Sequence, residues 1–322
     1  MNARQNRLCL VALLATVSCT VALSVWWRTV LQVSSRAPDE GDTNCPSQLI
    51  ALSNPTSSEL DIARRNLLCA ADLPGSAGDA LSSQLTTLDD WARRIALETT
   101  RHWHRYRQNP TEFNHSQGFF RMLMMAVVLS EDFNIKYDPG LRTSPGNASS
   151  HDGFFASADS VFLSGLLGPA RKGTCSSLPV LYVALGRRLG YPLHLVTTKG
   201  HLFVRWDGQG ERFNVEATGH GLNTFDDDYY RKWPFPITAE DESAEGYLRN
   251  LDAAGELAVF LSIRAMCLRE NGRVNEAAEA FAKAAQLAPH CNTYAMMHAE
   301  LDREAQRPRA DLGLTISKGT SP

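Results

Sequence analysis

The sequence predicts an α+β protein in which helical segments precede and follow a small antiparallel sheet. Before residue 130 and after residue 248, apolar residues recur at helical spacing. Between them, residues 201–206 and 212–216 alternate polar and apolar side chains on either side of a turn sequence, which is typical of a β-hairpin. The 322 residues are enough for one large domain and a small one.

An apolar segment near the N-terminus predicts attachment to a membrane. Residues 8–27 contain no charge, follow Arg4 and Arg7, and number 20, about what an α-helix needs to cross a bilayer. Trp26 and Trp27 lie at the end of this segment, where aromatic side chains typically anchor a helix at the membrane interface. We expect residues 1–7 in the cytoplasm, a single-pass anchor in the cell membrane, and the main domain outside the cytoplasm.

A cleavable signal sequence is the alternative to an anchor. Cleavage near Val33 to Ser35 would release a secreted or periplasmic protein. In both cases residues 28–58, rich in Ser, Pro, Asp and Asn, predict a linker, and residues 306–322 predict a disordered tail. The folded part should therefore comprise residues 59–305.

The composition is that of a folded protein and gives no sign of a nucleic-acid partner. Hydrophobic residues make up 43% and charged residues 21%, as in ordinary folded proteins. The formal net charge is −3, which gives no reason to expect a nucleic-acid partner.

Four segments predict helices in the main domain, residues 59–245. They are Leu60–Ala70, Asp89–Arg107, Phe119–Leu129 and Ser176–Leu189. Pro179 falls in the first turn of the last helix and Gly190 is a typical stop, so Cys175 lies at or just before a helix N-terminus. A loop is expected from Thr143 to Asp152.

The hairpin pattern places a histidine near a carboxylate. After a first strand at Leu193–Thr197, residues 207–210 give a four-residue turn sequence. If Trp206 pairs with Glu211, then His201 lies directly opposite Glu216. Opposed Cβ atoms are about 4.5–5.5 Å apart, within reach of a hydrogen bond. A slip of one residue would put the two side chains on opposite faces.

The segment 246–305 predicts a helical unit. Its pattern Ala277-x3-Phe281-x2-Ala284-x4-Pro289, preceded by Asn271-Gly272, matches the second helix of a tetratricopeptide repeat. One such unit cannot bury its own faces. We expect it to pack against the main domain and against a helix from Tyr294 to Ala305, and it could hold a protein partner.

One of the seven cysteines stands out. Two lie in the membrane segment, and four could pair in an oxidising compartment, Cys45 with Cys69 and Cys267 with Cys291. Cys175 is then left as a candidate reactive thiol. No cysteine spacing is typical of a metal site, and we expect neither a metal nor another cofactor.

Cys175, His201 and Glu216 together predict a nucleophilic site. A thiol reacts as its thiolate, which a helix N-terminus and a neighbouring imidazolium favour. His201 can take the thiol proton and return it to a leaving amine. Glu216 would fix the imidazole tautomer, and the Cys175 backbone N–H would serve as an oxyanion donor.

The motifs around these residues resemble the transglutaminase-like superfamily, which is related to the papain-type cysteine peptidases. They are Gly173-Thr174-Cys175-Ser176-Ser177, then Lys199 to Trp206, then Asn214-Val215-Glu216-Ala217-Thr218. The stretch from Leu60 to Tyr230, with its Arg-Arg-Leu-Gly-Tyr-Pro block at 187–192, is similar to the SirB-type family. The resemblance implies a papain-like core. Glu216 stands where most members have Asp, and many SirB-type members lack the cysteine.

Two functions follow from this pattern. The first is a cysteine enzyme that acts on amide bonds of a protein or peptide through an acyl-thioester on Cys175, as a peptidase, an amidase or a transglutaminase. The second is a non-enzymatic scaffold with a vestigial triad that binds a protein. Of the remaining polar residues, His220 is interpreted as a loop residue, and Asp226–Asp228 as an acidic helix start that indicates a cation site only weakly.

Overall fold

The computed structural model describes residues 61–76, 81–141, 153–219 and 221–306. The predicted cytoplasmic N-terminus, membrane segment and linker, the whole predicted loop Thr143–Asp152, and the predicted tail after Gln306 lie outside these residues. Within the described ranges, no helix is both long and apolar enough to span a membrane.

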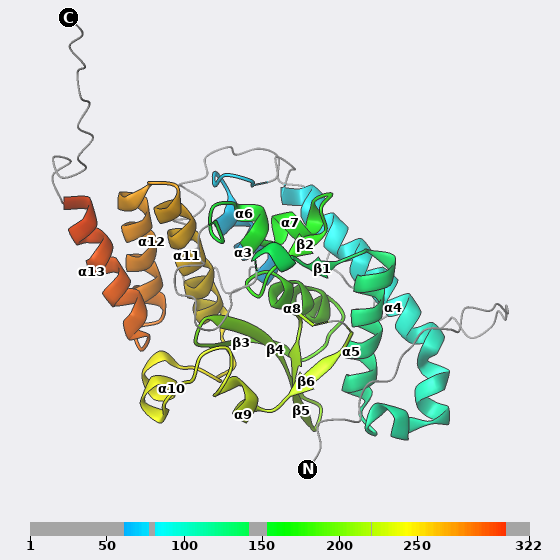
Figure 1. The fold of residues 1–322 in the computed structure, drawn as a ribbon. Coiled ribbons are helices and arrows are strands. Elements are labelled where there is room, and N and C mark those ends of the chain that lie inside the picture. The colour runs from blue at the N-terminus through cyan, green and yellow to red at the C-terminus, as the bar shows by residue number, and fades with distance from the viewer. Residues whose placement is uncertain (1–60, 77–80, 142–152, 220, 307–322) are drawn as a thin grey trace, which may run out of the picture. The chain divides into compact units, whose positions relative to one another are not determined.

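The predicted α+β class is confirmed (Figure 1). Along the chain, helices precede and follow the strands of a four-stranded antiparallel sheet. The helices are α3 (Ile62–Ala70), α4 (Leu81–Gln108), α5 (Gln117–Val127), α6 (Ala158–Val161), α7 (Leu163–Leu167), α8 (Leu178–Arg188), α9 (Asp227–Tyr230), α10 (Ala239–Glu245), α11 (Ala253–Glu270), α12 (Val274–Leu287) and α13 (Asn292–Gln306). The strands are β1 (Lys136–Tyr137), β2 (Lys172–Gly173), β3 (Leu193–Thr198), β4 (His201–Gly208), β5 (Glu211–Glu216) and β6 (Asn223–Phe225).

Helix α4 begins earlier than predicted, at Leu81 instead of Asp89. The reason is a further apolar repeat, since Leu81, Leu85 and Leu88 lie one helical turn apart and pack on the main core. Most of the polar residues between them face solvent, although Gln84 is buried, and they hide this repeat in the sequence.

The β4–β5 hairpin has a different register from the predicted one. Trp206 pairs with Phe213, so its predicted pairing with Glu211 is wrong by two residues. The turn is shorter than expected, because Gln209 and Gly210 alone form it. Their φ angles of 57° and 80° are those of the tight hairpin turn that suits the twist of antiparallel strands.

The shorter turn changes how His201 and Glu216 meet. A shift of two residues keeps every side chain on its face of the sheet. Continuing the observed register would set His201 opposite Thr218. His201 and Glu216 are therefore diagonal neighbours on one face and not directly opposed.

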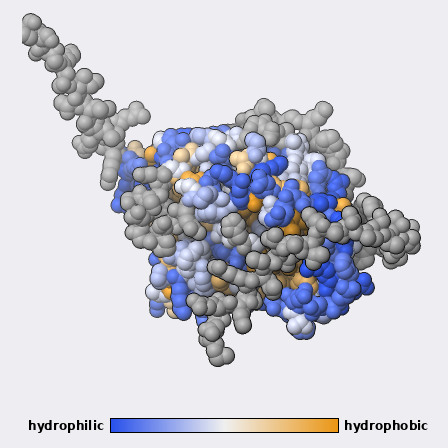
Figure 2. All heavy atoms as spheres, turned by 45° about the vertical axis from the view of Figure 1, so that its right-hand side comes forward, coloured by the Kyte–Doolittle hydropathy of each residue, from blue (hydrophilic) through white to orange (hydrophobic). Residues whose placement is uncertain are grey.

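The sheet is packed on both faces. Helix α8 lies against β3 and β4 on the face that carries Val204 and Trp206. On the other face the Phe203 ring stacks on Tyr230, with centroids 3.7 Å apart. Large apolar side chains that remain exposed among the described residues are Leu97 and Met296. The described surface in Figure 2 is accordingly mostly hydrophilic, with small separate hydrophobic areas.

The C-terminal helices are joined to the sheet and to α3. The Leu248 N–H donates to Thr197 O at 2.9 Å and the Leu251 N–H to Leu195 O at 3.0 Å, so the segment before α11 covers the edge of β3. Helix α11 packs on α3, and α12 lies between α11 and α13 (Figure 1).

A buried ion-pair cluster bridges the predicted boundary at residue 246. Glu256 of α11 is 0% exposed. It accepts hydrogen bonds from Arg65 of α3 at 2.6 Å and from Arg187 of α8 at 2.5 Å. A carboxylate buried this deeply needs both partners, which ties α11 to the main core.

Replacing Glu256 with Gln should strongly destabilise the protein. The change leaves the Arg65 guanidinium charged and unpaired in the core, and we expect a loss of about 3–5 kcal/mol in unfolding free energy. Urea denaturation measures it. Glu276→Gln, which breaks a partly exposed pair with Arg273, is the control and should cost under about 1 kcal/mol. Equal small losses in both variants would contradict the bridging role of Glu256.

Candidate active site

Cys175 lies in the turn that leads into α8, three residues before the helix begins at Leu178. The C=O of Thr174 accepts a hydrogen bond from the N–H of Leu178 at 3.0 Å, which closes this turn around Cys175. This turn is capped reciprocally. The Thr174 N–H donates to Ser177 Oγ at 3.0 Å, and the Ser176 N–H donates to Thr174 Oγ1 at 3.3 Å.

The cap leaves the backbone N–H of Cys175 available. Among the described residues this N–H has no backbone acceptor, as is usual in the first turn of a helix. The Cys175 side chain is 7% exposed and is a free thiol. A donor at the helix start beside a thiol is the arrangement that stabilises an oxyanion.

His201 and Glu216 are joined by a hydrogen bond across the hairpin. The distance from His201 Nε2 to Glu216 Oε2 is 2.8 Å, and the two residues are 6% and 5% exposed. The Thr218 N–H and hydroxyl donate to Glu216 Oε1 at 3.1 and 2.5 Å, and the Tyr230 hydroxyl donates to Oε2 at 3.3 Å. Both oxygens of the buried carboxylate are therefore satisfied.

These bonds decide the charge and the tautomer. Burial raises the pKa of Glu216, but hydrogen bonds from His201 and Thr218 outweigh it and hold that pKa below its usual value. Glu216 is thus a carboxylate and can only accept, so Nε2 of His201 carries the proton. Nδ1 is the ring nitrogen left free by that bond, and the neighbouring Cys175 is among the groups that raise the pKa of His201.

The imidazole is held in its charged form. Burial lowers the pKa of His201, but hydrogen bonds to Cys175 and Glu216 and the charge of Glu216 outweigh it and raise the pKa to about 9. A positively charged imidazole beside a cysteine is an arrangement found at nucleophilic thiols. The three predicted site residues are therefore brought together in one electrostatic unit.

Two aromatic residues pack beside His201, and the sequence did not indicate either of them. The edge of the Trp233 ring meets the His201 ring with centroids 4.6 Å apart, and Tyr230 lies parallel to it at 6.3 Å. Both residues follow β6, and no spacing pattern relates them to the hairpin. The nearest signal was their aromatic density between residues 225 and 235.

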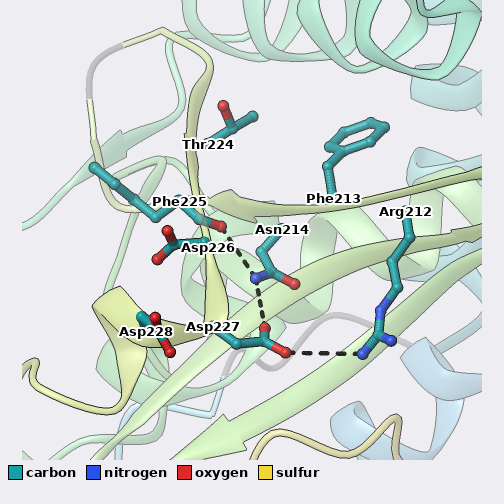
Figure 3. A pocket seen from close by; sticks show the side chains of 8 residues that line it. All are labelled: Arg212, Phe213, Asn214, Thr224, Phe225, Asp226, Asp227 and Asp228. Atoms are coloured by element: carbon teal, nitrogen blue, oxygen red, sulfur yellow. Dashed lines mark hydrogen bonds and ion pairs between the residues drawn. The ribbon is translucent and has the colours of Figure 1, made fainter. Parts of the chain in front are cut away.

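An open pocket of about 620 Å³ lies beside β5, β6 and α9, and none of the triad residues lines it (Figure 3). Asp227 points into it, but Arg205 and Asn214 donate to its Oδ1 at 2.6 and 2.8 Å. Asp226 caps α9 through the Tyr229 N–H. Groups of side chains able to hold a metal ion are absent from the described residues. The acidic stretch therefore serves the helix start and the ion pairs.

The expected pairing of Cys267 with Cys291 is wrong, because both are free thiols. Cys267 is buried within α11, and Cys291 Sγ donates to Glu245 Oε2 at 2.9 Å. Cys45, the predicted partner of Cys69, lies outside the described residues, as does His220.

Comparisons of the chain with protein-family models, with curated proteins and with solved structures found no match. The resemblance to the transglutaminase-like superfamily therefore stays a prediction.

The raised pKa of His201 predicts a pH-dependent stability. A group whose pKa is higher in the folded state stabilises the fold fully below its unfolded value near 6.5 and loses this contribution as the pH rises through about 9. Between pH 6 and 9, wild-type unfolding free energy should fall by on the order of 2–3 kcal/mol more than that of His201→Gln. Urea titrations at several pH values measure the difference. Equal slopes in the two proteins would contradict the charged His201.

Proposed function

We propose that the chain is a cysteine-dependent enzyme acting on amide bonds, with a papain- or transglutaminase-like core. The observation that carries this is the 2.8 Å hydrogen bond between His201 and Glu216, with Cys175 beside them at a helix start. The order along the chain, with a cysteine just before a helix and then two strands that carry His and a carboxylate, agrees with the resemblance found in the sequence.

In the first half of the reaction, Cys175 would attack the amide carbonyl carbon as a thiolate. The carbonyl π electrons move to oxygen, and the resulting oxyanion would accept a hydrogen bond from the Cys175 N–H. As the C–N bond breaks, the charged His201 gives its proton to the leaving amine. The product is an acyl-thioester on Cys175 and a neutral His201 still held by Glu216.

In the second half, a nucleophile would cleave the thioester. Neutral His201 takes a proton from water or from an amine as it attacks the thioester carbonyl, and the thiolate of Cys175 leaves. Water gives hydrolysis, as in a peptidase or amidase, and an amine gives transfer, as in a transglutaminase. No cofactor is needed for either outcome.

A non-enzymatic scaffold is the second candidate, and the burial of the site favours it. Cys175, His201 and Glu216 are each at most 7% exposed, whereas an amide substrate must reach the sulfur. A triad that is retained only for stability would have this appearance. The two candidates differ in the reactivity of Cys175 toward a small electrophile.

Alkylation of Cys175 by iodoacetamide tests the enzymatic proposal. If His201 holds Cys175 as a thiolate, the wild-type rate should remain appreciable at pH 6.5 and should fall at least about tenfold in His201→Ala, because a neutral thiol is a poor nucleophile. Mass spectrometry locates the adduct among the cysteines. His104→Gln, an exposed histidine of α4, is the control and should leave the rate unchanged.

A wild-type rate that rises only with the ionisation of an ordinary thiol near pH 8.5, and that is the same in His201→Ala, would favour the scaffold.

We also propose that the domain is held outside the cytoplasm by residues 8–27, which are apolar and follow two arginines. After cell fractionation, the full-length chain should be in the membrane fraction and should be extracted by detergent but not by high salt. A soluble mature protein that begins after Ser35 would instead show a cleaved signal sequence.

A further inference from the structure

Lysine is rare in this chain and is concentrated around the candidate active site. The sequence has six lysines against 26 arginines. Four of the six are exposed and lie on segments that adjoin the triad, namely Lys136, Lys172, Lys199 and Lys232. Elsewhere in the described part of the chain, the exposed cationic side chains are arginines, so this grouping is not a consequence of composition.

Two of the four lysines lie on the Cys175 side. Lys172 precedes Cys175 by three residues, and Lys136 pairs with Lys172 across the parallel strands β1 and β2. Paired residues of neighbouring strands present their side chains on the same side, and like charges there repel. Among the described residues, one of these four lysines forms an ion pair. Lys172 Nζ lies 3.8 Å from Asp138 Oδ2.

The other two lie on the His201 side. Lys199 is in the β3–β4 turn, two residues before His201, and Lys232 adjoins Trp233, whose ring meets the His201 ring. The two segments are in contact, because a Cβ atom on Gly200 would come within 3.0 Å of the Phe235 ring. Exposed lysines therefore stand on segments on both the Cys175 side and the His201 side of the site.

We infer that the site takes acidic peptides, with carboxylates on residues flanking the amide that reacts. The inference rests on the proposed enzymatic function and adds the substrate class to it. The whole chain has a net charge of −3 and would repel such a peptide, whereas the four lysines on the segments beside the thiol would attract it. Lysine suits this task because its flexible ammonium group can meet a carboxylate in several positions, whereas arginine favours one planar geometry.

Two alkylating reagents of nearly equal size measure this field. Iodoacetate is an anion and iodoacetamide is neutral, so the ratio of their rates at Cys175 reports the local potential. A cation about 10 Å away in a water-like medium changes this ratio roughly twofold. We expect the iodoacetate rate divided by the iodoacetamide rate to fall about 3- to 10-fold in the full chain when all four lysines are replaced by Gln. The change should be smaller at high salt.

The controls separate the charge effect from a folding defect and from the proposed function. Lys283→Gln, on the remote helix α12, should leave the ratio unchanged. The iodoacetamide rate of the quadruple variant should stay within about twofold of wild type, and the single variants Lys172→Gln and Lys199→Gln should shift the ratio in the same direction. Failure of the proposed function would appear instead as an iodoacetamide rate that is independent of His201.

A peptide competition tests the substrate class itself. Hexaglutamate should slow the alkylation of wild-type Cys175 by iodoacetamide more than hexaglutamine does, and the difference should disappear in the quadruple variant. An unchanged reagent ratio in that variant, or equal protection by the two peptides, would overturn the inference.

Discussion

The two-residue turn at Gln209–Gly210 is the constraint on which the site depends. Because both residues have positive φ, the turn closes tightly and fixes the pairing of β4 with β5. That pairing puts His201 and Glu216 on one face of the sheet as diagonal neighbours, and they meet at 2.8 Å. The longer side chain of glutamate suits this diagonal. A one-residue change in this turn would carry Glu216 to the opposite face and leave His201 without its carboxylate.

Burial then gives the pair its chemical character. A charged imidazole and a carboxylate removed from water are costly unless their hydrogen bonds are complete. The Glu216 carboxylate accepts four hydrogen bonds. The His201 ring packs against the rings of Trp233 and Tyr230. The turn that leads into α8 supplies the backbone N–H of Cys175 beside the thiol. These groups are contributed by a helix start, a hairpin and the segment after β6, so the site exists only when the whole domain is folded.

Much of this could be predicted from the sequence, because periodicity is robust to small errors. Side chains alternate along a strand, so an error of two residues in the register still left His201 and Glu216 on one face. The sequence predicts too long a turn, because Asp207 and Gly208 are common turn residues but extend β4 in the structure. Glu256 could not be recognised as a core residue, since its arginine partners are 69 and 191 residues away in the chain. Trp233 was missed for a similar reason, because packing and not spacing brings it to His201.

The protonation of the His201 ring tests the central claim most directly. Nitrogen-15 NMR of labelled protein distinguishes imidazolium from the two neutral tautomers. We expect both ring nitrogens of His201 to carry protons at pH 7, with the Nε2 proton shifted downfield by its bond to Glu216 and lost from that position in Glu216→Gln. Above about pH 9 the ring should become neutral and keep the proton on Nε2. A neutral ring at pH 7 with its proton on Nδ1 would contradict the proposed triad.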